Sequence, residues 1–306
     1  MVDINLVKDI VCLGCSSNEI IRRGTRESKG AGKNQRYECK NCRYRFSVYN
    51  DLWEMKKYEK QTINDSNSDK KINFELTPKE RINNLIIPNL VDEDLAYFCG
   101  ILAGDGSIRY QKEKGQYEVH CAGNPKDEKE FYNEIVVPLI KKLFNLDVKP
   151  KYLDKAKIYG IDICSKNIVK YLNEFIGLPL GNKYDSLHIP KIFINDKIFV
   201  RNFICGLADT DFHLQIKRGY YPVIKGVSKS ESFIKEIRMF LEQDGFKVCN
   251  YKRQQFDERV NKTIITYSIE LSGYKQFIPW MEKIGFRHPK NKDKIENLVS
   301  YYRENK

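Results

Sequence analysis

The 306-residue sequence has no apolar run long enough to cross a bilayer, and no signal peptide opens it. These absences argue against the membrane-spanning and secreted classes, so we expect no membrane partner and a cytoplasmic protein, nucleoid-associated if the host is a prokaryote. Histidine is scarce, and its four positions show neither zinc-site nor nucleophile spacing. We therefore expect ordinary, hydrogen-bonded roles for His120, His188, His213 and His288.

The cysteines do not form the even, regularly spaced set of a disulfide framework. There are nine, and five of them stand alone in apolar surroundings. An odd, scattered set of this kind predicts reduced thiols in the core. The five are Cys99, Cys121, Cys164, Cys205 and Cys249.

Acidic residues are outnumbered, with 41 Asp and Glu against 53 Lys and Arg. The formal charge of +12 and the pI of about 9.1 favour a polyanionic partner. The length allows two or three domains with cores of their own.

The first 50 residues contain a cysteine cluster with the pattern C-x2-C, 23 intervening residues, C-x2-C, formed by Cys12, Cys15, Cys39 and Cys42. Two such knuckles can place four thiolates around one structural Zn2+, and a segment this short has little core without one. The pattern resembles the zinc ribbons of some transposases and transcription factors. Basic and aromatic residues alternate around the second knuckle, which suits DNA contact by phosphate binding and stacking, or simply a solvated surface. They are Arg36, Tyr37, Arg43, Tyr44 and Arg45.

A polar, patternless segment over 51–75 reads as a linker. A short helix over 76–91 is expected to follow, because Thr77, Pro78 and Glu80 form a cap, an N1 proline and a capping-box acid. Asp92 is the expected cap of the next helix.

Two related stretches, 96–108 and 203–216, organise the remainder of the chain. Each is apolar with small residues four apart, Gly100 with Gly104 and Gly206 with Thr210, and each stops at an acid. Small residues at this spacing let two helices approach closely, so we expect the helices to pack together and to bring Asp105 next to Asp211. Two carboxylates at two helix C-termini require a cation, and Mg2+ or Mn2+ with oxygen ligands suits them. The alternative is a pair of buried core helices that each end in an ordinary surface Asp.

The segments after each stretch repeat the order αββαββα, which predicts an internal duplication over 92–200 and 201–306. We expect an α+β fold with two four-stranded antiparallel sheets forming a saddle. Side chains two apart on its polar face could contact DNA bases or phosphates, although an antiparallel sheet often keeps one face in water. The candidates are Arg109, Gln111, His213, Gln215, Lys217, Lys155, Lys157, Lys252 and Arg253.

The two stretches resemble the signature of LAGLIDADG (DOD-type) homing endonucleases in their two-motif, monomeric form. The first matches at Gly100, Ile101, Leu102, Asp105 and Gly106, and the second at Gly206, Leu207, Asp209 and Asp211. The resemblance implies a site-specific endonuclease of double-stranded DNA that acts in intron homing, with divalent metal at Asp105 and Asp211. It also implies a basic residue near each acid, and Lys183 and Lys290 follow the two acids by 78 and 79 residues. Two features depart from the signature, Ala103 where an Asp is common and Phe212 in place of the closing Gly, which could shift the exit from the second helix.

Two other functions are compatible with these patterns. The same saddle could serve a transcription regulator or an intron RNA maturase that has lost cleavage, and Phe212 favours this reading. A transposase-like enzyme would rest on the ribbon alone. The chain ends without a terminal His-Asn pair, so we expect a free-standing protein rather than a self-splicing intein.

Overall fold

The computed structural model describes residues 17–28, 32–43, 45–48, 74–154, 157–183, 186–258 and 261–304. The chain divides into two compact units, Met1–Gln61 and Thr62–Lys306. This division falls inside the predicted linker, most of which lies outside the described residues. Among the described helices, none has the length and apolar character of a membrane span.

The first unit contains a three-stranded antiparallel sheet in the order β1-β2-β3. Its strands are β1 (Ile20–Ser28), β2 (Gly32–Cys39) and β3 (Arg45–Val48). After β2 the chain turns sharply: the main-chain N–H of Arg43, at φ 62°, donates to Cys39 O at 3.0 Å. Cys39 is buried and Cys42 exposed at this turn, and Cys12 and Cys15 lie outside the described residues.

The second unit opens with α2 (Pro78–Ile82), one turn of helix. The predicted capping box is confirmed, because the hydroxyl of Thr77 accepts from Glu80 N while a Glu80 oxygen accepts from Thr77 N. Glu80 is buried and also accepts from Ser165 and Asn167, so this short helix is tied to the first repeat.

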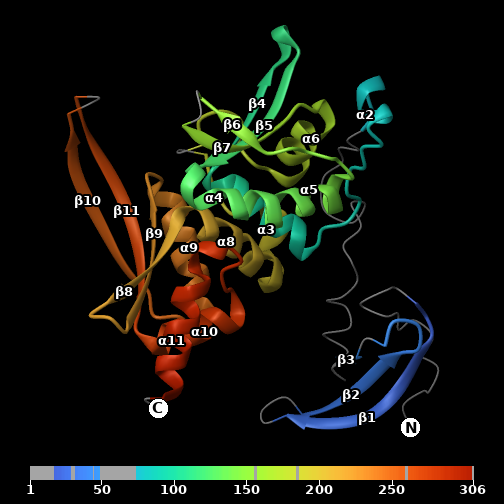
Figure 1. Cartoon of the computed structure of the whole chain (residues 1–306), viewed down its shortest axis with the longest axis vertical. Helices are drawn as coiled ribbons and strands as arrows, with labels where there is room; N and C mark the ends of the chain where they lie inside the picture. The colour runs from blue at the N-terminus through green and yellow to red at the C-terminus, as the bar shows by residue number, and fades with distance from the viewer. Residues whose placement is uncertain are drawn as a thin grey trace. The chain divides into compact units, whose positions relative to one another are not determined.

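The order αββαββα occurs twice in the second unit (Figure 1). The first repeat comprises α3 (Glu93–Gly104), β4 (Gly106–Gln111), η3 (Lys112–Lys114), β5 (Gln116–Gly123), α4 (Pro125–Phe131), η4 (Tyr132–Val136), α5 (Val137–Phe144), β6 (Lys151–Leu153), β7 (Ile158–Ile163), α6 (Lys166–Lys170) and η5 (Tyr171–Ile176). After α7 (Lys191–Ile194), the second comprises α8 (Lys197–Asp211), β8 (Phe212–Lys217), β9 (Tyr221–Ser228), α9 (Glu231–Gln243), β10 (Cys249–Asp257), β11 (Lys262–Ser272), α10 (Tyr274–Lys283), η6 (Pro289–Asn291) and α11 (Lys292–Glu304).

Each repeat has one four-stranded antiparallel sheet, in the order β4-β5-β7-β6 in the first and β8-β9-β11-β10 in the second. The α+β class with antiparallel sheets is therefore confirmed. Apolar side chains alternate toward the helices, as in β8, where Leu214 is buried and Gln215 is exposed.

The boundary expected between the repeats, at 200/201, falls inside α8. This helix begins at Lys197 because the carboxylate of Asp196 accepts from Ile198 N and caps it. The signature match begins only at Phe203 and so gave a boundary that was too late. In the first repeat, the prediction that Asp92 caps the helix is confirmed by its 2.8 Å hydrogen bond from Leu95 N.

Candidate functional site

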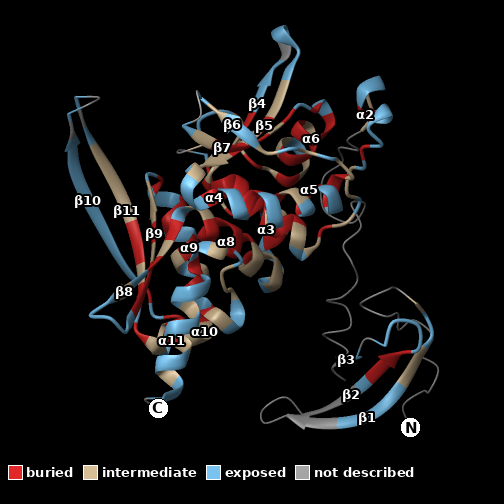
Figure 2. Ribbon diagram, viewed as in Figure 1, coloured by how far each residue is buried: buried red, intermediate tan, exposed pale blue. Residues whose placement is uncertain are grey.

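Helices α3 and α8 lie side by side at the centre of the second unit (Figure 2). Helix α3 is buried from Leu95 to Gly104, and α8 is buried from Phe203 to Asp209. Their contact passes through two glycines. A Cβ on Gly100 would overlap the carbonyl oxygen of Phe203, and a Cβ on Gly206 would overlap that of Tyr97. The contact is thus backbone against backbone, and no larger residue fits at either glycine without moving a helix.

The same close approach continues to the C-terminal ends of the helices. A Cβ on Gly104 would overlap the hydroxyl of Thr210 and lie 3.5 Å from the carboxyl carbon of Asp211. Thr210 keeps its hydroxyl on its own helix, donating to Leu207 O at 3.0 Å. Since Asp105 is the C-cap of α3 and Asp211 is the last residue of α8, the structure brings the two acids together.

Both acids have lost part of their hydrating water, and the charge of Asp211 acts on Asp105. Asp105 is half-buried, and although Asp211 has an exposed edge, protein atoms crowd its carboxyl group. Loss of water, then the charge of Asp211, raises the pKa of Asp105 to about 7. Loss of water also raises the pKa of Asp211, while the ammonium groups of Lys183 and Lys290 oppose the increase.

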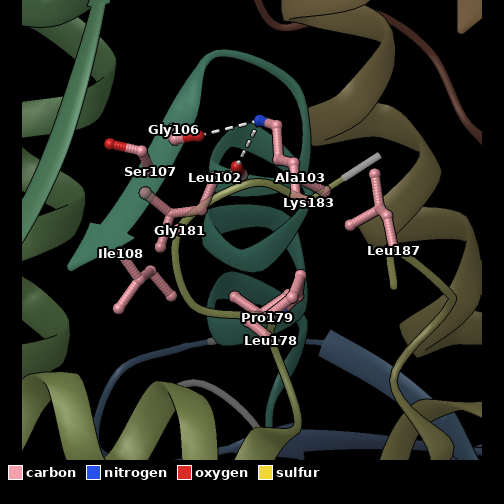
Figure 3. A pocket seen from close by; sticks show the side chains of 10 residues that line it. All are labelled: Leu102, Ala103, Gly106, Ser107, Ile108, Leu178, Pro179, Gly181, Lys183 and Leu187. Carbon is pink, nitrogen blue, oxygen red and sulfur yellow. Dashed lines mark hydrogen bonds between the residues drawn. The ribbon is translucent and has the colours of Figure 1, made fainter. Parts of the chain in front are cut away.

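Lys183 reaches the end of α3. Its ammonium donates to the carbonyl oxygens of Leu102 at 3.2 Å and Gly106 at 2.8 Å (Figure 3). It also donates to the carbonyl oxygen of Gly104. The carbonyls of Leu102 and Gly104 are in the last turn of α3, which has no further turn to satisfy them, and Gly106 begins β4. Lys183 therefore acts as a C-terminal cap of α3. Burial lowers the pKa of Lys183, and the negative charge of Asp211 opposes that shift.

Lys290 occupies the matching place at the end of α8. Its ammonium donates to the carbonyl oxygen of Asp209 at 3.0 Å and to Glu128 Oε1 at 3.3 Å. The two lysines, 78 and 79 residues beyond the two acids, thus occupy corresponding positions at the two helix ends.

Glu128 and His288 complete the surroundings, and sequence reasoning assigned neither to the site. Glu128 is buried on α4, and its Oε2 accepts from His288 Nε2 at 2.9 Å. Burial raises the pKa of Glu128, but its hydrogen bonds to His288 and Lys290 more than offset this, so the net shift is downward. A Cβ on Gly123 would lie 3.1 Å from the carboxyl carbon of Glu128 and 3.5 Å from Asp105 Oδ2, so this third acid borders the pair.

Asp209, two residues before Asp211, has a structural role. It is fully buried and accepts from the hydroxyl of Tyr97 at 2.6 Å and from the main-chain N–H groups of Arg287 and His288. Burial raises the pKa of Asp209, and these hydrogen bonds oppose the shift. The carboxylate of Asp209 therefore joins α3 to the loop before η6.

Phe212 does not disturb the exit from α8. Its ring is buried and lies against Gly226, the residue paired with it on β9, where a Cβ would lie 2.7 Å or less from the ring atoms. In the first repeat the glycine is on the other strand, since Gly106 pairs with Cys121. Each of these two strand pairs contains one glycine, and in both repeats a strand begins directly after the acid.

The paired acids suit a hard divalent cation. Two carboxylates held together, with the pKa of one raised by the charge of the other, carry negative charge that Mg2+ or Mn2+ would offset with oxygen ligands. Among the described residues, no group of three or more His, Cys, Asp or Glu side chains is arranged as a metal centre. Asp105 and Asp211 would therefore need water or a substrate oxygen to complete the coordination.

The residues predicted to read DNA project from the strands that follow the acids and from the second hairpins. In β4 the buried Ile108 precedes the exposed Arg109, and in β8 the buried Leu214 lies between His213 and the exposed Gln215. Lys252 and Arg253 are consecutive on β10 and therefore point to opposite faces of that strand. Lys155 lies outside the described residues, and His213 is half-buried. The exposed members are Arg109, Gln111, Gln215, Lys217, Lys157, Lys252 and Arg253.

Comparison with known proteins gives distant matches, and no family model matches the chain. A DNA polymerase of Thermococcus hydrothermalis is 24% identical over 226 residues, which are 73% of this chain but only 13% of that protein. The homing endonuclease I-DmoI, solved with DNA and Ca, is 17% identical with a TM-score of 0.46, covering 67% of this chain and 97% of its own.

Two further solved structures are similar at a lower level. The homing endonuclease I-WcaI, bound to its DNA recognition sequence, is 13% identical with a TM-score of 0.43 over 72% of this chain and 95% of its own. The N-terminal LAGLIDADG domain of DUF199/WhiA is 12% identical with a TM-score of 0.40 over 71% and 93%. TM-scores below 0.5 do not establish a common fold.

Proposed function

We propose that this chain is a site-specific endonuclease of double-stranded DNA, with two LAGLIDADG-type repeats and a divalent cation at their interface. The observation that carries the proposal is the meeting of Asp105 and Asp211 at the ends of two helices packed backbone to backbone. Two ordinary core helices that each end in a surface Asp would not be expected to bring two acids and two lysines together at one site.

Asp105 and Asp211 would hold the cation, and Lys183 and Lys290 would keep positive charge beside it. When bound, Mg2+ or Mn2+ supplies an acidified water and stabilises charge on the phosphate oxygens. The protein's own contribution is to orient the two carboxylates and to place the exposed cations and amides of both sheets along the duplex. A near-symmetric pair of half-sites suits the two strands of DNA, one strand for each half.

Several parts of the proposal concern the rest of the chain. Cys12, Cys15, Cys39 and Cys42 would hold a structural Zn2+ in the first unit, which would add DNA contacts. The turn with Cys39 and Cys42 at its two ends supports this assignment. We also propose that the protein works as a monomer in the cytoplasm and that it acts in intron homing.

A binding protein without cleavage, either a regulator of transcription or an RNA maturase, is the second candidate. Phe212 is the feature that favoured it, and Gly226 now accounts for Phe212 without any loss of the acid beside it. The nuclease is therefore the better supported of the two.

The test uses the full chain and a library of randomised duplexes. With Mg2+ present, we expect the wild type to select and cut a recurrent sequence, and Asp105→Asn or Asp211→Asn to slow double-strand cleavage by about a thousandfold. Both variants should still bind the selected duplex in Ca2+ within about threefold of wild type. Asp127→Asn, an exposed acid on α4, is the matched control and should cut normally. Binding without cutting by the wild type would point instead to the regulator or maturase.

A further inference from the structure

Lys183 and Lys290 occupy equivalent places but use their donors differently. An ammonium group has three N–H donors. Those of Lys183 face three main-chain carbonyls of its own repeat, at Leu102, Gly104 and Gly106. All its donors are therefore committed to the end of α3.

In the hydrogen bonds that the structure shows, Lys290 uses two donors. One goes to the carbonyl oxygen of Asp209, near the end of α8 in the same repeat. The other goes to Glu128 Oε1, 3.3 Å away in the other repeat. The Lys290 side chain is 28% exposed. The third donor is thus left for a group that enters beside Asp211.

Glu128 is held in turn by His288. The Nδ1 of His288 accepts from the main-chain N–H of Lys290 at 3.0 Å, so Nε2 carries the proton that it donates to Glu128. The imidazole lies parallel to the ring of Phe131 with centroids 4.3 Å apart. Glu128, His288 and Lys290 therefore form a closed set of contacts between α4 and η6.

The second repeat has no counterpart of this acid. Counting from the helix caps Asn124 and Ser230, the position of Glu128 on α4 corresponds to Ile234 on α9, a buried apolar residue. The contacts of Glu128 thus make the two halves chemically different beside the two lysines, although Lys183 and Lys290 have corresponding places in the sequence.

Resting on the proposed nuclease, we infer that Glu128 is a positioning residue that holds Lys290 with one N–H free for a phosphate oxygen, whereas Lys183 chiefly caps α3. Cleavage of one strand then depends on the Glu128–Lys290 contact, and cleavage of the other does not. The two strands are cut in a fixed order when this contact is weakened.

The experiment measures single-turnover cleavage of each strand separately, on an end-labelled duplex selected by the wild type. Glu128→Gln keeps the size of the side chain but removes its charge, and we expect it to slow one strand by about a hundredfold and the other by less than about threefold. Nicked duplex should accumulate. Glu130→Gln, an exposed acid on the same helix, is the matched control and should show no nicked intermediate beyond that of wild type.

A double-variant cycle separates positioning from a general structural effect. Lys290→Met should slow the same strand, and adding Glu128→Gln to it should slow that strand by no more than about twofold further, because both changes remove one interaction. Equal slowing of both strands, or independent multiplication of the two effects, would overturn the inference. Melting curves and Ca2+-supported duplex binding establish that each variant is folded.

Should Glu128→Gln fail to fold, Lys183→Met and Lys290→Met decide the matter alone. A strand-specific defect only in Lys290→Met supports the inference, and mirror-image defects in the two variants overturn it. Failure of the proposed function would look different, because the wild type would then bind duplex DNA and cut neither strand.

Discussion

The two repeats of the second unit share their order of elements and their sheet topology, yet they leave the acid-bearing helix by different means. In the first repeat Gly106 faces Cys121, and in the second Phe212 faces Gly226. In both repeats one residue of the pair is a glycine, which leaves room for the side chain opposite it. The glycine is on β4 in the first repeat and on β9 in the second. A signature residue can therefore be lost from one strand when its partner compensates.

The repeats differ more at their outer hairpins. In the first repeat, β6 and β7 pair over three residues. In the second, β10 and β11 pair from Cys249 to Asp257, and β11 leaves β9 at Tyr267, so the far end is a two-stranded ribbon with β10 exposed along its described side chains (Figure 2). This ribbon carries the exposed side chains of Lys252, Arg253 and Phe256, so the outer hairpin of the second repeat presents a longer exposed surface than that of the first.

The largest effect is expected from exchanging the glycine between strands. Phe212→Gly alone should lower the free energy of unfolding by about 3 to 5 kcal/mol, because a buried ring is removed. Gly226→Cys alone should also destabilise strongly, because its side chain would meet the ring of Phe212.

The double variant copies the glycine and cysteine of the first repeat, and we expect it to recover at least about 1 kcal/mol relative to the sum of the single variants. Denaturant unfolding of the four proteins provides the measurement. Additive losses would show that the two pairs are not equivalent solutions.

A smaller effect is expected on the pH dependence of stability, through the raised pKa values of Asp105 and Asp211. The pKa of Asp105 is about 7 in the folded protein, so between about pH 4 and pH 7 the folded state holds a proton that the unfolded state has released. Without metal, stability should fall as pH rises through this window. Asp105→Asn cannot titrate, so its melting temperature should match wild type near pH 4 and exceed it by about 4 °C at pH 8.

Asp211→Asn should behave in the same direction, since the pKa of Asp211 is also raised. Calorimetric scans in chelator across that pH range test both variants. Parallel curves for wild type and variants would contradict the raised pKa values of the two acids. In wild type, Mg2+ should remove most of the loss at high pH, because the cation replaces the proton.

The smallest effect concerns the unequal hairpins. Arg253→Ala, on the long ribbon, should weaken binding similarly for all duplexes and reduce the slope of log K against log salt by about 1, as expected for one lost phosphate contact. Lys157→Ala, on the short hairpin, is the matched change in the first repeat and should alter the slope less. Equal slopes for the two variants would remove the functional difference between the hairpins.

Features that depend on sequence periodicity or on a repeated offset could be predicted. The order of elements, the caps at Thr77 and Asp92, and the alternating faces of β4 and β8 follow from local patterns. The lysines were found because nearly the same spacing, 78 and 79 residues, follows each acid, and the structure places both lysines at helix ends.

Features that depend on partners distant in sequence could not be predicted. Glu128 looks like one more acid on a charged helix, and only the fold shows that it faces His288 and Lys290, 160 and 162 residues later. Phe212 was interpreted as a departure from the signature because its partner Gly226 lies on the next strand, β9, and the sequence of β8 does not indicate this pairing. For Asp209, the signature indicates an acid but not that it accepts hydrogen bonds from a tyrosine and a loop instead of a substrate.

Because α3 and α8 touch backbone to backbone at their glycines, the radius of the helices sets the distance between the two repeats, and side-chain volume does not. Residues elsewhere along the two helices can then change size over evolutionary time without moving the halves relative to each other. A chimera that joined either repeat to a foreign one with glycine at the same place would inherit the same spacing between its halves.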